Sequence, residues 1–111
     1  DSSEIDGVRI AIMEVTGDLK KMTKMLKELT LDADQPTLAV LGSREGGGKL
    51  MIAVTEGTAA SERYDAVALL RIISPHIKGG GGGRPTLAQG GGSFPDGLDD
   101  ALAAARSEVG L

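Results

Sequence analysis

Residues 8–30 read VRIAIMEV, then TGD, then LKKMTKMLKELT. The first run is mostly apolar and β-branched at both alternating positions, which is typical of a strand covered on both faces. Residues 16–18 have turn chemistry, and Asp18 is the expected N-cap of the segment that follows. From Leu19 to about Thr30, apolar residues recur at helical spacing. A doubly covered strand followed by an amphipathic helix predicts an α/β sheet.

The rest of the chain predicts two further strands and two further helices. Residues 37–43 and 49–55 are apolar runs joined by a glycine-rich turn, so we expect an antiparallel hairpin. The small and polar residues 56–63 predict a loop. Asp65 is placed to cap a helix that Pro75 interrupts, and Asp96 is placed to cap a last helix. Because a helix connects the first two strands, these strands should run parallel.

This order predicts a single α/β domain, with a small mixed β-sheet of three to four strands and about three packed helices. Residues 86–89 would supply the fourth strand, at an edge of the sheet. The chain starts with Asp rather than Met, so we interpret residues 1–7 as the N-terminal edge of an excised fragment. Residues 8–111 form the predicted domain.

The composition, 41% apolar and 25% charged over 111 residues, is typical of one soluble domain. The absence of Cys excludes disulfides and a thiolate zinc site. With no long apolar run and no signal peptide, we expect a cytoplasmic protein without a membrane segment. His76 is the only histidine, and no serine has a neighbouring base in the sequence. We therefore expect neither catalytic nor metal-binding residues.

Charge is distributed unevenly along the chain. The net charge of −4 is unfavourable for a nucleic-acid-binding domain. However, residues 19–27 hold four lysines and no acid, and residues 66–95 hold basic residues and no acid. Lys20, Lys24 and Lys27 share one face of the predicted helix. The ordinary interpretation of this row is a solvated face, and flanking contact with nucleic acid is the alternative.

Residues 79–92 read GGGGGRPTLAQGGG, with eight glycines in fourteen residues. Such a run is either a flexible linker or an ordered loop whose bare backbone approaches a ligand and offers N–H groups to an anion. We favour the ordered loop, because Arg84-Pro85 supplies a fixed charge and a locked φ, and periodic apolar sequence lies on both sides. No Gly-Lys-Ser/Thr follows, so the run is not a P-loop. Residues 46–48, a second glycine triplet, are interpreted only as a turn.

Residues 76–92, HIKGGGGGRPTLAQGGG, resemble the signature of the C-terminal domain of alanyl-tRNA synthetases, which belongs to the DHH-associated family. The specific parts are Arg84-Pro85 and Ala88-Gln89, and the similarity spans about residues 8–109. The resemblance implies a domain without an active site that binds the tRNA elbow, links the aminoacylation and editing modules and often assists dimerisation. It implies no cofactor in this chain, since ATP, magnesium and zinc would be bound by the other domains of the parent synthetase.

Two other functions stay open. The family's other branch holds the substrate nucleotide of DHH-type phosphodiesterases, but it carries Gly-Gly-His where this chain has Gly-Arg-Pro. The last alternative is a homodimerisation module whose glycines only allow close packing.

The residue types favour recognition of folded RNA by shape. Tyr64 and Phe94 are the only aromatic residues, too few for a base-stacking platform, whereas phosphate and 2′-OH contacts need bare backbone and positive charge. The predicted tRNA contacts are Lys78, Gly79, Gly80, Gly81, Gly82, Gly83, Arg84, Gln89, Gly90, Gly91 and Gly92. The predicted flanking contacts are Lys20, Lys24 and Lys27.

Overall fold

One mixed sheet of six strands forms the centre of the computed structural model, which describes residues 2–111. The strands are β1 (Ser2–Ile5), β2 (Val8–Glu14), β3 (Thr37–Ser43), β4 (Gly48–Val54), β5 (Gly79–Arg84) and β6 (Leu87–Gly92). Their spatial order is β1-β2-β3-β4-β6-β5. β2 and β3 run parallel, as predicted, and the other neighbouring pairs are antiparallel.

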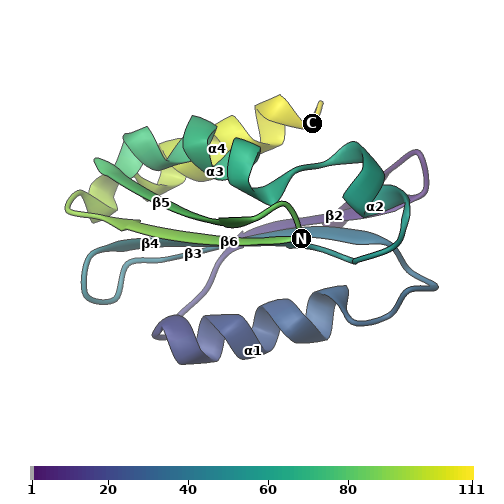
Figure 1. Cartoon of the computed structure of the whole chain (residues 1–111). Helices are drawn as coiled ribbons and strands as arrows, with labels where there is room; N and C mark the ends of the chain where they lie inside the picture. Colours follow the sequence, from purple (N-terminus) through teal and green to yellow (C-terminus); the bar gives the residue numbers. More distant parts are fainter. Residues whose placement is uncertain (1) are drawn as a thin grey trace.

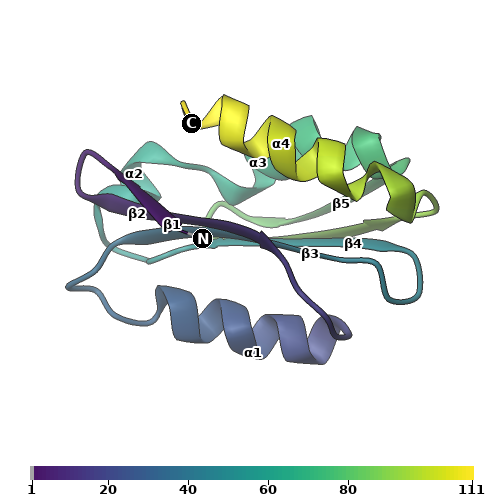
Figure 2. The ribbon, with the colours of Figure 1, turned by 180° about the vertical axis from the view of Figure 1, so that it is seen from behind.

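Helices cover both faces of this sheet. The α-helices are α1 (Leu19–Thr30), α2 (Ala59–Arg63), α3 (Ala66–Ile73) and α4 (Leu98–Glu108), and two short 3₁₀-helices are η1 (Ser74–Ile77) and η2 (Pro95–Gly97). α1 lies on one face, and α3 and α4 lie on the other (Figure 1). The view from behind shows β1 and β2 between the same two layers (Figure 2).

Each face of the sheet has its own apolar core. The core beneath α1 includes Met22 and Leu26 of the helix against Leu41 and Met51 of the sheet. The larger core, beneath α3 and α4, buries alternate residues of β2, β3 and β4 against residues such as Leu70. Every residue of β3 is therefore buried, which explains why the central strands read as continuous apolar runs rather than alternating ones.

The α/β class and single domain are confirmed, but the predicted number of strands is too low. No strand or helix is predicted before residue 8, whereas β1 pairs antiparallel with β2. The turn between them is Asp6-Gly7, with φ values of +49° and +83°, which is the dipeptide that two-residue hairpin turns favour. Arg63 donates a hydrogen bond to the Asp6 carboxylate at 2.6 Å and so fixes this turn to α2.

Helix starts depend on local capping side chains. Asp18 accepts a hydrogen bond from the Lys21 N–H, and Asp65 accepts from the first-turn N–H groups of α3, so both predicted N-caps are confirmed. The prediction for Asp96 is wrong, because it lies within η2 and the N-cap of α4 is Gly97. The predicted loop at residues 56–63 is also wrong in part. There, Thr58 starts α2 with a capping box.

Pro75 acts as predicted. α3 ends at Ile73, and the chain continues as η1 with Pro75 in its first turn. Among residues 2–111, no helix is long and apolar enough to cross a membrane.

Candidate nucleic-acid interface

The glycine-rich stretch is a β-hairpin rather than a loop. β5 and β6 pair from Gly79 opposite Gly92 to Arg84 opposite Leu87, and β6 also pairs with β4. β5 is thus the edge strand of the sheet, and it faces the viewer in Figure 1. The prediction of an ordered segment is confirmed. β6 has a hydrogen-bonding partner strand on each side, whereas β5 is paired on one side only. Free main-chain N–H groups for an anion are therefore a prediction for β5 and not for β6.

The strand predicted at residues 86–89 exists, but it is longer and lies inside the sheet. Polyglycine carries no strand propensity of its own. Both strands of the hairpin form because β4 offers an edge for pairing and because α3 packs beside β5. The main-chain N–H of Ala66, at the start of α3, donates to the carbonyl oxygen of Pro85 in the hairpin turn at 2.8 Å.

Five of the glycines are required by close approach within the hairpin. A Cβ atom on Gly79, Gly81 or Gly83 would collide with main-chain atoms of β6. A Cβ atom on Gly90 would lie 2.5 Å from the Gly80 oxygen, and one on Gly92 would collide with the Ile77 oxygen. Main-chain atoms cannot move aside as a flexible side chain can. The fold itself therefore explains why these positions are glycine.

The other three glycines of the hairpin are not explained in this way. A Cβ atom on Gly80 or Gly82 would meet no heavy atom of residues 2–111 within 4 Å. A Cβ atom on Gly91 would meet only the Gly48 oxygen, at an ordinary contact distance of 3.4 Å. None of the three has a φ in the positive region that favours glycine. The fold of the chain thus allows side chains at all three positions.

These three glycines lie on the same side of the sheet as α1. Directly paired residues share a face, which gives three rows across β4, β6 and β5. The rows are Lys49–Gly91–Gly80, Met51–Gln89–Gly82 and Ala53–Leu87–Arg84. Met51, Ala53 and Leu87 belong to the core beneath α1. We call the exposed surface formed by Gly80, Gly82, Arg84, Gln89 and Gly91 the bare face.

Two hollows lie between α1 and the bare face. The first, of about 320 Å³, is lined by Lys27 and Thr30 of α1, by Glu56, and by Arg84 and Leu87 of the hairpin. It brings together Lys27 and Arg84, which sequence analysis predicts as tRNA-binding residues from separate parts of the chain. The second, of about 280 Å³, lies at the other end of α1 and is lined by Leu19, Lys49, Gln89 and five glycines.

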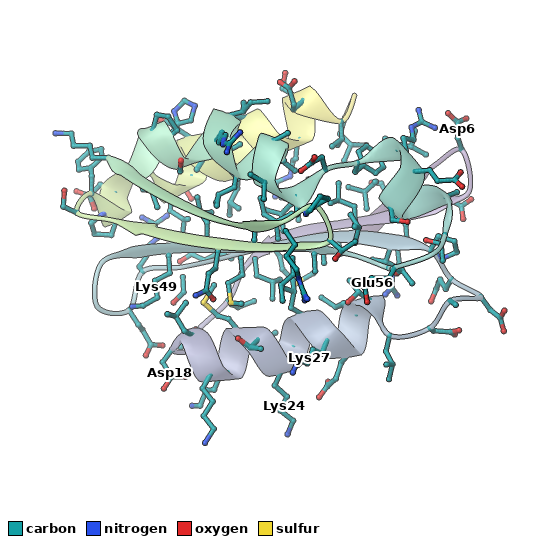
Figure 3. All side chains as sticks on the ribbon, viewed as in Figure 1. Asp6, Asp18, Lys24, Lys27, Lys49 and Glu56 are labelled. Carbon is teal, nitrogen blue, oxygen red and sulfur yellow. The ribbon has the colours of Figure 1, made fainter. Side chains whose placement is uncertain are left out.

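The remaining predicted contacts lie at the margins. Lys78 precedes β5 with a left-handed φ of +52°, and its ammonium nitrogen lies 5.0 Å from the centre of the Phe94 ring. Lys20 and Lys24 are exposed, and neither is among the described residues that line the two hollows. Figure 3 shows Lys24 pointing away from the sheet and Lys49 near the β3–β4 turn. Within residues 2–111, no carboxylate forms an ion pair with Lys27, Lys78 or Arg84.

Sequence reasoning missed Lys49 and Glu56. Lys49 follows the glycine triplet at residues 46–48, which sequence analysis interprets only as a turn. Pairing of Gly48 with Gly92 places this triplet beside the one at residues 90–92. A lysine directly after a glycine triplet was the available signal.

The described residues contain no group of three His, Asp or Glu side chains placed to hold a metal ion.

The arrangement matches a known fold. The chain superimposes on the crystal structure of the C-Ala domain from Aquifex aeolicus alanyl-tRNA synthetase with a TM-score of 0.79, 22% identity and 96% of both chains covered. This likeness defines the fold class, a compact α/β domain. A family model described as the DHHA1 domain matches residues 7–110. The chain therefore belongs to the DHHA1 domain family, and the predicted resemblance is confirmed.

The similar curated proteins are alanine–tRNA ligases. The protein from Pediococcus pentosaceus is 35% identical over 103 residues, which cover 93% of this chain and 12% of that protein. The protein from Methanococcoides burtonii is 34% identical over 103 residues, covering 92% and 11%. The protein from Levilactobacillus brevis is 40% identical over 92 residues, covering 81% and 10%. The chain thus spans about a tenth of the length of these relatives.

Proposed function

We propose that this chain is the tRNA-binding accessory domain of an alanyl-tRNA synthetase, which docks the tRNA elbow and links aminoacylation to editing. The observation that carries the proposal is the open space above Gly80 and Gly82. The fold tolerates side chains there, so their absence is best explained by a flat partner that approaches the backbone closely. The names of the relatives, alanine–tRNA ligases, support the same function.

The charges around the bare face fit RNA better than protein. Arg84 and Lys27 border the same hollow as Glu56, whose carboxylate accepts a hydrogen bond from the Thr86 hydroxyl at 3.2 Å. Neither cation forms an ion pair with a carboxylate of the described residues. Such cations can bind phosphate oxygens, and bare backbone can bind 2′-OH groups, which is how folded RNA is recognised by shape. Base stacking contributes little, because Tyr64 and Phe94 are the only aromatic residues and neither belongs to the bare face.

The wider role follows from the same assignment. The other domains of the synthetase would be the covalent partners of this domain, a second copy would associate through the C-terminal region, and the protein would be cytoplasmic. ATP, magnesium and zinc would be bound by those other domains and not by this one.

Substitutions at the open glycines test the proposal. Gly80→Val and Gly82→Val should weaken binding of an alanine tRNA transcript about tenfold or more without unfolding the chain, because the added side chains separate the two surfaces. Ala103→Val, on the exposed face of α4, is the control for added apolar bulk and should bind like the parent. Gly81→Val is not a clean test, because its side chain would collide with the Gln89 main chain.

A charge reversal tests the same face independently. Arg84→Glu should weaken tRNA binding about tenfold and make the log–log salt slope less steep, by about 0.7–0.9 for each phosphate that the variant no longer binds. Arg71→Glu, an exposed position on α3, makes the same charge change away from the bare face. If the Arg84 and Gly82 variants both bind tRNA like the parent, the hairpin is not the contact surface.

A further inference from the structure

We infer that the second hollow, beside Lys49, is a phosphate-binding site that holds a backbone phosphate of the RNA docked on the bare face. This inference rests on the proposed function and adds to it a phosphate site built around Lys49, a residue outside the predicted contact set. We call this hollow, lined by Leu19, Gly46, Gly48, Lys49, Gln89 and residues 90–92, the Lys49 hollow.

The walls of the Lys49 hollow are almost free of side chains. Five of its eight lining residues are glycine, contributed by two triplets that lie far apart in the sequence. Pairing of β4 with β6 brings the triplets together, with Gly48 opposite Gly92 and Lys49 opposite Gly91. The hollow is therefore a property of the folded sheet, and neither triplet forms it alone.

Gly91 shows that the hollow is kept open beyond what the fold requires. A Cβ atom at this position would meet only the Gly48 oxygen, at 3.4 Å, and φ is not in the left-handed region. A side chain would thus be compatible with the strand, yet it would project into the hollow beside Lys49. The space is best explained by a ligand that occupies it.

The chemistry of the hollow selects an anion. The Lys49 ammonium donates a hydrogen bond to the main-chain oxygen of Glu45, which holds it at the rim. No carboxylate of residues 2–111 forms an ion pair with Lys49. A half-buried lysine without a counterion, next to the Gln89 amide, suits a phosphate oxygen.

The position of the hollow makes the RNA backbone its ligand. Lys49, Gly91 and Gly80 form one row across the sheet, so the Lys49 hollow is continuous with the bare face. The hollow with Lys27 and Arg84 lies toward the other end of α1. A strand of RNA lying along α1 would place phosphates at both ends, and each contact would release counterions.

The first test compares Lys49→Gln with the control Lys21→Gln. Lys21 is an exposed residue of α1, and it is not among the described residues that line the two hollows. Lys49→Gln should weaken binding of the alanine tRNA transcript about three- to tenfold and make the salt slope less steep by about one. Lys21→Gln should change both quantities much less. Gly91→Val, which fills the hollow while Lys49 stays, should reproduce the weaker affinity.

The second test does not need RNA. Inorganic phosphate added to the whole chain should shift the backbone amide resonances of Gly46, Gly48 and Gly91, and these shifts should vanish in Lys49→Gln. Phosphate-induced shifts confined to the exposed lysines of α1 would overturn the inference.

The tRNA-binding test separates this inference from the proposed function. If Lys49→Gln and Gly91→Val bind tRNA like the parent while Arg84→Glu binds more weakly, the inference fails and the proposed function stands. If the Arg84 and Gly82 variants are unchanged as well, the hairpin is not the contact surface, and the proposal that RNA docks on the bare face fails too.

Discussion

A methyl group on Gly81 would collide with the main-chain oxygen of Gln89, its near neighbour across the hairpin. One residue earlier, a methyl group on Gly80 would meet no heavy atom of the described chain within 4 Å. These two adjacent positions are therefore glycine for different reasons. Gly81 is required by the fold, whereas Gly80 is required only if something binds the bare face.

This difference predicts opposite effects on stability. Gly81→Ala should lower the free energy of unfolding by about 2 kcal/mol, because the new methyl group forces the two strands apart. Gly80→Ala should be neutral or stabilise by about 0.4–1 kcal/mol, since it restricts the unfolded chain without a clash. Urea unfolding of both variants checks this. If the two substitutions lower the free energy of unfolding equally, the distinction between glycines required by the fold and glycines at open positions is wrong.

A second close contact joins the sheet to α4. A Cβ atom on Gly42 of β3 would lie 2.6 Å from Leu98 Cδ1, and Leu98 is fully buried. Gly42→Ala should destabilise by about 1–3 kcal/mol through overpacking, and Leu98→Ala by about 2–5 kcal/mol through the cavity it leaves. The double variant should be more stable than the sum of the two effects predicts, because the new methyl group occupies space that Leu98 vacates. Additive effects in thermal unfolding would show that the two residues do not share this space.

The central elements could be predicted because each shows one clear pattern of apolar residues: helical spacing in α1, and a continuous apolar run in β3. Residues 37–43 and the helix from Leu19 to Thr30 match the structure to the residue. β1 was missed because its sequence, SSEI, has no apolar run, and the Asp6-Gly7 turn was the only signal. β5 could not be predicted, because its six residues become a strand only through pairing with β6. The division of the glycines into required and open positions depends on that pairing, so the sequence could not show it either.

Asp65 links helix capping to the hairpin. Its carboxylate accepts hydrogen bonds from the N–H groups of Val67 and Ala68 at 2.9 and 3.1 Å, while the Ala66 N–H donates to the Pro85 oxygen. Asp65→Ala should lower the free energy of unfolding by about 1 kcal/mol, and Asp65→Asn by less, because Asn still caps. Hydrogen exchange should quicken at Ala66 in the Ala variant. Unchanged exchange there would show that the cap does not hold the hairpin turn.

A substitution at Lys78 should change the free energy of unfolding and the tRNA affinity in opposite directions. Its φ of +52° is a left-handed conformation that costs a side-chain-bearing residue about 1 kcal/mol relative to glycine. Lys78→Gly should therefore stabilise the chain, even though it removes the contact with the Phe94 ring. If Lys78 binds a phosphate at the start of β5, the same variant should bind tRNA less tightly and with a shallower salt slope. Phe94→Leu, which removes the ring and keeps the charge, is the matched control and should leave the slope unchanged. A more stable Lys78→Gly variant with unaltered tRNA affinity would remove Lys78 from the contact surface, and would confine the RNA to the bare face between Arg84 and the Lys49 hollow.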